Sequence, residues 1–289
     1  AWQQVSDRFG VPTICLGHGK EKGFGVIAYG KTGGVELGYS SDLDLVFVHQ
    51  SESDEVTTGK ADGSKVIAAS QFYMKLAQRI MHIFNTRMNS GILYELDMRL
   101  RPSGNSGLLV VHLNTFANYQ HEDAWTWEHQ ALVRARMIFG NVELHKEFVT
   151  IRQDVLSRPR EFLTLKSDIV SMREKMRSHL DKSDESHLDI KQGKGGLVDI
   201  EFLAQFLVLA HAKEYSELMN YCDNLGIFKS LLKLNLLEKA EQQQLSHMYQ
   251  KLRALGHQAT MQNAGQLINK STITGQVAIS EIWQKRLVD

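Results

Sequence analysis

The stretch Gly33–Val48, which reads GGVELGYSSDLDLVFV, decides how the fold is interpreted. Its second half, Leu43–Val48, is rich in the branched and aromatic residues that favour β-strands. Asp42 and Asp44 stand at the start of this run, and side chains two residues apart project from one face of a strand, about 7 Å apart. Acids held this close raise each other's pKa unless a cation lies between them. The pattern predicts a divalent-metal site, and the simpler interpretation is a solvated loop before a buried strand.

Composition limits the classes of partner. The 33 basic and 33 acidic residues of this 289-residue chain give a formal net charge of zero, whereas proteins that bind a nucleic-acid backbone usually carry a basic excess. We therefore expect no nucleic-acid partner. No apolar run reaches the ~18 residues that a membrane helix needs, and no signal peptide opens the chain, so we expect no membrane association.

The cysteines and the first residues bear on location and context. Only two cysteines occur, Cys15 and Cys222, and they are too far apart in sequence to suggest a zinc site or a disulfide framework. A reducing, cytoplasmic location is expected. The chain opens within a helical pattern at Ala1–Val5, which predicts that it was cut from a longer protein.

Apolar periodicity predicts an α+β fold. We expect a catalytic domain over residues 1–155, with a mixed sheet and helices, followed by an all-helical bundle domain over residues 156–289. The strand at 108–113 is expected to be the hairpin partner of the strand at 92–100, and no strand is expected after it. The predicted strands are 24–29, 43–49, 92–100 and 108–113; the predicted helices are 1–10, 64–89, 114–139, 141–157, 162–180, 197–211, 223–237, 238–262 and 275–288.

A third acid strengthens the metal hypothesis. Asp97 lies in the alternating stretch 92–100, whose other face is apolar. Three carboxylates on adjacent strands after a glycine-rich turn suit two-metal phosphoryl or nucleotidyl transfer, with hard oxygen ligands for Mg²⁺ or Mn²⁺. Arg99 shares the face of Asp97, where it either contacts phosphate or neutralises the acids. The residues expected along the phosphate are Gly30, Gly33, Gly34, Ser40 and Ser41.

Other polar and aromatic residues have less specific interpretations. Arg134 and Arg136 stand two apart in a predicted helix, so at most one is expected to reach a cleft. The pair Trp125 and Trp127 is more typical of a core than of base stacking.

Asp199 and Glu201 open a predicted helix and diverge by about 200° around it. A helix-dipole or inter-domain salt-bridge role is therefore expected for them rather than a second metal site.

Long sequence blocks resemble a known family. The stretch Gly33–Val48 followed by YELDMRLRPSG (Tyr94–Gly104) resembles the DNA polymerase β-like nucleotidyltransferase superfamily. Lys31–Asp44, Tyr94–Gly104, Trp125–Arg136 and Gly195–Phe202 are similar to blocks of the bacterial glutamine synthetase adenylyltransferase family, in the same order. The resemblance implies that Asp42, Asp44 and Asp97 are catalytic and bind two magnesium ions. It also implies that ATP lies against the glycines and serines named above.

The same resemblance implies an activity and partners. Full-length members have two homologous halves, of which the C-terminal one transfers AMP from ATP to a tyrosine of glutamine synthetase. This chain resembles the C-terminal half, so the N-terminal half, glutamine and a PII signalling protein are expected partners or regulators. The deadenylylating half, a catalytically silent nucleotide- or protein-binding regulatory domain, and a uridylyltransferase specificity remain alternatives.

Overall fold

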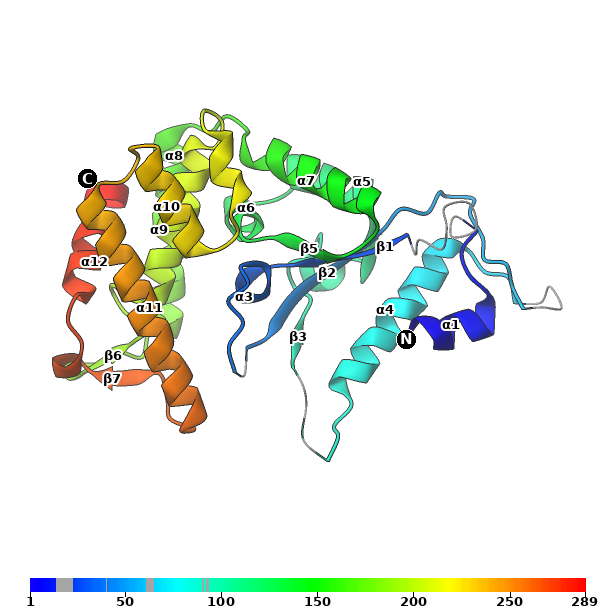
Figure 1. The fold of residues 1–289 in the computed structure, drawn as a ribbon, viewed down its shortest axis with the longest axis horizontal. Helices are drawn as coiled ribbons and strands as arrows, with labels where there is room; N and C mark the ends of the chain where they lie inside the picture. The colour runs from blue at the N-terminus through cyan, green and yellow to red at the C-terminus, as the bar shows by residue number, and fades with distance from the viewer. Residues whose placement is uncertain (14–22, 40, 61–64, 90, 92–93) are drawn as a thin grey trace. The chain divides into compact units, whose positions relative to one another are not determined.

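The computed structural model describes residues 1–13, 23–39, 41–60, 65–89, 91 and 94–289. They form two compact units, and each is described by itself (Figure 1). The sheet unit comprises Ala1–Gly33, Ser41–Ala124 and Ala135–Arg152. The helical unit comprises Gly34–Ser40, Trp125–Arg134 and Gln153–Asp289. The predicted division at residue 155 stays a prediction.

The sheet unit is built on a mixed five-stranded sheet in which β2 is the centre. The strands are β1 (Phe24–Ala28), β2 (Leu43–His49), β3 (Leu96–Asp97), β4 (Val110–His112) and β5 (Arg136–Phe139). Their order is β3-β2-β1-β5, with β4 also paired to β2. β1 runs antiparallel to β2 and β5, whereas β3 and β4 run parallel to β2. The strands predicted at 24–29 and 43–49 are thereby confirmed.

Two strand predictions were wrong. β4 pairs with β2 and is not a hairpin partner of β3, because β3 ends at Asp97 and the chain turns there. Arg101 stabilises this turn by donating from its Nη1 to the carbonyl oxygen of Met98 at 2.7 Å. β5 lies where a continuous helix was expected over 114–139; the helix ends at Val133, and pairing with β1 makes Arg136–Phe139 a strand.

Helices cover both faces of the sheet, and α4 supplies much of the core. In Figure 1, α4 and α1 lie on one side of the sheet, and α5 and α7 lie on the other. Phe72, Tyr73 and Leu76 of α4 are buried in one apolar cluster with Phe47 of β2. The helices are α1 (Trp2–Phe9), α3 (Gly30–Gly33), α4 (Ala69–Asn85), α5 (Leu113–Glu122) and α7 (Val142–Leu156), with the 3₁₀ turn η1 (Gly104–Ser106).

The helical unit is organised around α9, which is apolar on nearly all sides. Helices of this kind occupy the centre of a bundle, and α9 contacts α6, α8, α10, α11 and α12. The helices are α6 (Thr126–Val133), α8 (Phe162–Leu180), α9 (Leu197–His211), α10 (Asn224–Lys233), α11 (Lys239–Met261) and α12 (Gln276–Trp283), with shorter turns η2 (Ser216–Asn220), η3 (Lys270–Thr272) and η4 (Gln284–Val288).

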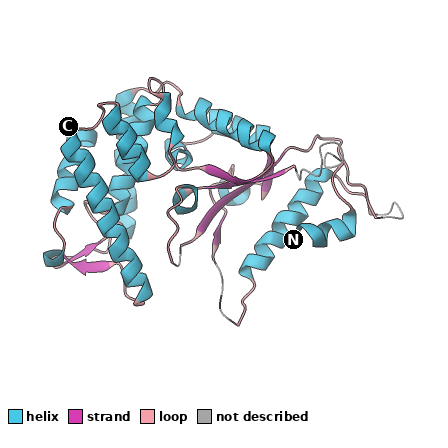
Figure 2. Ribbon diagram, viewed as in Figure 1, coloured by secondary structure: helices cyan, strands magenta, loops and turns pink. Residues whose placement is uncertain are grey.

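The α+β fold class is confirmed, but the expectation that no strand follows residue 113 was wrong in the helical unit as well. A short antiparallel ribbon of β6 (His187–Asp189) and β7 (Leu267–Asn269) lies in the helical unit, and Figure 2 shows it in magenta. Among the described residues, no helix has the length and apolar character required to span a bilayer.

The core position of Phe72 gives a stability prediction. Phe72 is fully buried, whereas Ile83 of the same helix is 46% exposed. Replacing Phe72 by Ala removes a large buried ring, and we expect the free energy of unfolding to fall by about 3–5 kcal/mol. Ile83→Ala is the matched control, with an expected loss below about 1 kcal/mol. Urea denaturation followed by circular dichroism measures both, and equal losses would contradict the packing described.

Candidate active site

The register of two neighbouring strands places two of the predicted acids side by side. β2 and β3 are parallel, with Leu43 opposite Leu96 and Asp44 opposite Asp97. Neighbouring strands lie about 4.8 Å apart, and residues in register share a face of the sheet. The ladder continues one residue before the strands, where the amide of Leu43 donates to the carbonyl oxygen of Glu95 at 2.8 Å. Asp42, immediately before β2, is exposed.

The acids carry more negative charge than their surroundings neutralise. Burial raises the pKa of Asp44 to about 6, and repulsion from Asp97 and Asp42 adds to the shift. Lys31 and Arg99 act in the opposite direction but do not cancel it. A cation placed beside Asp44 would therefore be bound favourably.

Asp97 differs because Arg99 neutralises it directly. The Nε of Arg99 donates to the two carboxylate oxygens of Asp97 at 3.0 and 2.8 Å, and the backbone amide of Arg99 donates to Oδ1 at 2.9 Å. These hydrogen bonds hold the pKa of Asp97 below its ordinary value. The side chain of Arg99 is 74% exposed. Of the two roles predicted for Arg99, neutralisation is the one seen here, and contact with phosphate stays a prediction.

Position 30 has no room for a side chain, because the Asp44 carboxylate lies against it. Gly30 has a φ of +53°, and a Cβ there would lie 2.5 Å from Oδ2 of Asp44. The amide of the preceding Tyr29 donates to the backbone oxygen of Asp44 at 2.9 Å. The glycine-rich turn is a single helical turn, α3, whose first residue lies against the Asp44 carboxylate.

Arg136 holds the other end of α3. Its Nε donates to the carbonyl oxygen of Gly33 at 3.1 Å, and its Nη2 donates to that of Thr32 at 3.3 Å. A cation at the last carbonyls of a helical turn is favourable for the helix dipole. Arg136 lies on β5, so the prediction that treated it as a helix residue was wrong.

A cavity of about 420 Å³, a size typical of small-molecule sites, opens beside Asp42 and Asp97, and Asp44 is not among its lining residues. It is lined by Asp42, Met81, Glu95, Leu96, Asp97, Met98, Arg99, Arg101, Asn105 and Leu109. Its wall thus combines carboxylates with two arginines, the chemistry that a metal-bound polyphosphate requires.

The sheet unit and its acids match a known enzyme family. Residues 1–151, more than half of the chain, match the family model described as glutamate-ammonia ligase adenylyltransferase. The chain belongs to this family. Residues 166–267 match a second model, described as GlnD PII-uridylyltransferase.

Curated adenylyltransferase relatives align along nearly all of the chain. Each of three is named bifunctional glutamine synthetase adenylyltransferase/adenylyl-removing enzyme. The protein of Mannheimia haemolytica is 46% identical over 99% of this chain and 29% of its own length. The protein of Shewanella loihica is 51% identical over 94% of this chain and 28% of its own length. The protein of Vibrio parahaemolyticus is 48% identical over 99% of this chain and 30% of its own length. The chain therefore spans about three-tenths of the length of these relatives.

The remaining residues predicted to contact phosphate differ in their burial and in the unit to which they belong. Ser41 is buried, and Ser40 lies outside the described residues. Gly34 packs within the helical unit, where a Cβ would lie 2.7 Å from Nη2 of Arg134 and 3.0 Å from the backbone oxygen of Cys222. Packing thus accounts for the glycine at position 34. Phosphate contacts by these residues, and by Gly30 and Gly33, stay predictions.

The metal role of the three acids also stays a prediction. Across the described part of the chain, no three or more His, Cys, Asp or Glu side chains lie close enough together to hold a metal ion. In this structure both carboxylate oxygens of Asp97 accept from Arg99.

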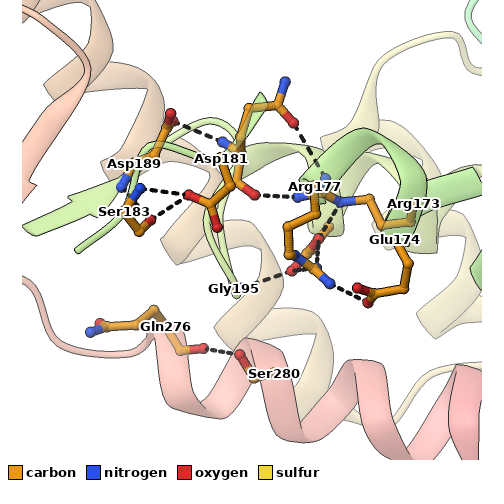
Figure 3. Close-up of polar contacts among 11 residues, drawn as sticks. Arg173, Glu174, Arg177, Asp181, Ser183, Asp189, Gly195, Gln276 and Ser280 are labelled. Carbon is orange, nitrogen blue, oxygen red and sulfur yellow. Dashed lines mark hydrogen bonds and ion pairs between the residues drawn. The ribbon is translucent and has the colours of Figure 1, made fainter. Parts of the chain in front are cut away.

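Asp199 has a structural partner set inside the helical unit. It is buried and accepts from Nε of Arg173 at 2.6 Å, from Nη2 of Arg177 at 2.8 Å, and from the amide of Gly195 at 2.8 Å. Figure 3 shows Arg173, Arg177 and Gly195 in this cluster. Asp199 does form salt bridges, but Arg173 and Arg177 belong to the same unit, so the inter-domain interpretation was wrong for this residue.

Two other sequence interpretations require correction or addition. Trp125 is 71% exposed and Trp127 lies at the surface, so the core interpretation of this pair was wrong. Glu36 was missed. It is only 6% exposed and carries a buried charge, and the one sequence signal for it is a charged residue among glycines and apolar residues.

Substitution of Gly30 separates two costs: that of a left-handed backbone conformation and that of a steric clash with Asp44. Gly104 has nearly the same φ, +54°, but an added Cβ there meets nothing closer than 3.5 Å. We expect Gly104→Ala to cost about 1–2 kcal/mol from the left-handed conformation alone. Gly30→Ala is expected to cost more, because Asp44 must also move. Urea denaturation compares them, and equal losses would contradict the placement of Gly30 against Asp44.

The raised pKa of Asp44 predicts an unusual dependence of stability on pH. The folded state holds this proton up to about pH 6, whereas the unfolded chain releases it near pH ~4. Between these values the folded state binds more protons, so its stability falls as pH rises. In EDTA, Asp44→Asn is therefore expected to be about 2–3 kcal/mol more stable than wild type at pH 7.5, with the difference shrinking at pH 4.5. An Asn variant less stable than wild type at pH 7.5 would contradict this electrostatic description.

Proposed function

We propose that this chain transfers AMP from ATP to a tyrosine of glutamine synthetase and releases pyrophosphate. The observation that carries the proposal is the register of Asp44 with Asp97 on adjacent strands, with Asp42 two residues before Asp44 and a cavity lined by Asp42 and Asp97. Membership of the adenylyltransferase family supports the choice of nucleotide and of protein substrate. The tyrosine hydroxyl oxygen forms a bond to the α-phosphorus, and the bond from that phosphorus to the β-phosphate bridging oxygen breaks.

The three carboxylates are the residues that would hold Mg²⁺, with Mn²⁺ as the other suitable ion. Their hard oxygen atoms and their excess negative charge fit such an ion. The bound metal would neutralise the triphosphate and lower the pKa of the attacking hydroxyl. Arg99 would have to release Asp97, and its exposed side chain has room to do so. It would then be placed to contact phosphate oxygens.

Asp97 is the proposed acceptor of the hydroxyl proton. A tyrosine hydroxyl has an ordinary pKa of about 10 and therefore needs only modest assistance. Gly30, Gly33 and the amides of α3 would lie along the phosphates. Gly34, Ser40 and Ser41 complete the proposed phosphate side of the site.

The direction of the reaction is proposed from three sequence blocks. Trp125–Arg136, Met172–Arg177 and Trp283–Asp289 resemble the adenylylating half of the family more than the adenylyl-removing half. The printed name of the relatives includes both activities, so the phosphorolytic reaction, which releases ADP, is the second candidate. Glutamine, a PII signalling protein and the N-terminal half are proposed to act on the full-length enzyme.

The two directions are distinguished by assaying the chain both ways. With α-labelled ATP, Mg²⁺ and unmodified glutamine synthetase, we expect label on the synthetase and release of pyrophosphate. With adenylylated synthetase and phosphate, we expect no ADP. UTP in place of ATP tests the base, and we expect at least a tenfold lower rate. ADP release without transfer from ATP would assign the chain to the adenylyl-removing half.

The acids are tested by substitution in the same assay. Asp42→Asn and Asp44→Asn are each expected to lower the transfer rate at least 1,000-fold, because a lost carboxylate leaves the metal and triphosphate charge poorly neutralised. Asp54→Asn is the matched control in the same unit, since Asp54 is exposed. Retained activity in either site variant, with a native melting temperature, would refute the site assignment.

A further inference from the structure

The segment Gly34–Tyr39, directly before the catalytic strand, alternates between buried and exposed side chains. Glu36 is buried, whereas Val35 is 78% and Tyr39 is 69% exposed. Val35 has a φ of +56°, which is costly for a β-branched residue. An extended segment in a strained conformation persists only where its surroundings hold it firmly.

Glu36 provides that hold. Nη2 of Arg134 donates to its Oε2, and the hydroxyl of Tyr249 donates to the same oxygen at 2.5 Å. Nη1 of Arg253 lies 4.0 Å from Oε1, and Nη2 of Arg253 donates to the backbone oxygen of Glu36 at 2.7 Å. The contacts thus fix the backbone and the side chain together.

A second acid completes the charge balance of this network. Glu201 accepts from Nη1 of Arg134 at 2.8 Å and from the hydroxyl of Tyr249 at 3.4 Å. Two carboxylates therefore face two arginines, which is the condition for burying such charges. Burial raises the pKa of the Tyr249 hydroxyl, and Glu201 and Glu36 raise it further, so the hydroxyl stays protonated and donates.

Neighbouring residues of the segment pack closely on the same helices. A Cβ at Gly34 would meet Arg134, and a Cβ at Gly38 would meet the ring of His257. Arg134 and Arg136, two residues apart in the sequence, therefore hold the chain on both sides of the Gly33–Gly34 bond. Arg136 holds the carbonyl oxygens at the end of α3, and Arg134 holds the Glu36 carboxylate.

We propose that Glu36 is a positioning residue for nucleotidyl transfer, which anchors the chain between α3 and the acids Asp42 and Asp44 at the start of β2. The first turn residue of α3 lies against the Asp44 carboxylate, and Gly33 is only three residues before Glu36. Releasing Glu36 frees the segment at its centre and lets α3 and Asp42 move relative to each other. This inference rests on the proposed function, because the positioned groups are the acids of that site.

The test compares two acids of one network in the 289-residue chain. Glu36→Gln removes the carboxylate charge that holds the segment. Glu201→Gln removes a carboxylate charge that faces the same two residues, Arg134 and Tyr249, but Glu201 is not part of the segment. The first readout is amide hydrogen exchange of residues 34–44 by mass spectrometry. The second is kcat for AMP transfer and KM for glutamine synthetase.

For Glu36→Gln, we expect faster exchange across residues 34–44, a kcat at least tenfold lower, and a KM for the synthetase within threefold of wild type. Glu201→Gln is expected to retain wild-type exchange in this segment and a kcat within threefold. If Glu36→Gln folds poorly, Tyr249→Phe removes the hydroxyl that donates to Glu36 at 2.5 Å and to Glu201 at 3.4 Å. It is expected to show the same exchange pattern with a kcat about threefold lower.

Several outcomes would overturn the proposal. Wild-type hydrogen exchange of residues 34–44 in Glu36→Gln would contradict it. Faster exchange of these residues with a wild-type kcat would contradict it too. Equal losses of kcat and melting temperature in Glu36→Gln and Glu201→Gln would also do so, because they would indicate a general stability effect. If wild type catalyses neither transfer nor phosphorolysis, the proposed function fails, and hydrogen exchange alone then accepts or rejects Glu36 as the anchor.

Discussion

The placement of a mostly buried Asp44 in register with Asp97 on parallel strands is the constraint on which the proposed site depends. Ionising Asp44 is disfavoured by about 3 kcal/mol, given the shift of its pKa to about 6. Burial of Leu45, Val46 and Phe47 in the same strand contributes about 1.5–3 kcal/mol for each side chain. The burial of these side chains outweighs the cost of ionising Asp44, which comes mainly from the burial of its carboxyl and secondly from repulsion by Asp97 and Asp42. Arg99 neutralises only Asp97, and the charge that remains would favour a cation beside Asp44.

The sequence was sufficient to predict the strands and helices that are determined by their own local pattern of apolar residues. The strand at 43–49 and the helices at 162–180 and 197–211 were predicted nearly to the residue, because apolar runs and periodicity are local properties. β5 was missed because Arg136–Phe139 becomes a strand only through pairing with β1. The partner of β4 was missed for the same reason, since pairing depends on where the chain returns. Asp42, Asp44 and Asp97 could be named as candidates from spacing, and the strand register now gives a geometric reason for grouping the last two.

The features that escaped prediction share one cause. A buried charge such as Glu36 looks like a solvated one in sequence, because its partners Arg134 and Tyr249 lie about 100 and 210 residues further along. Trp125 looks like a core residue, although most of its surface is exposed. The close packing at Gly34, where an added Cβ would meet the Arg134 guanidinium and the backbone oxygen of Cys222, has no signal in the sequence. Long-range packing decides each of these roles, and the sequence alone does not specify it.

The central claim is that the acids beside β2 form a metal–nucleotide site. A crystal structure with Mg²⁺ and an ATP analogue that cannot be cleaved between the α- and β-phosphates tests it most directly. The account predicts cation density bound by Asp42, Asp44 and Asp97, with the Arg99 side chain released from Asp97 and turned towards phosphate. Nucleotide bound elsewhere, with the Arg99–Asp97 pair intact and no cation beside Asp44, would contradict it.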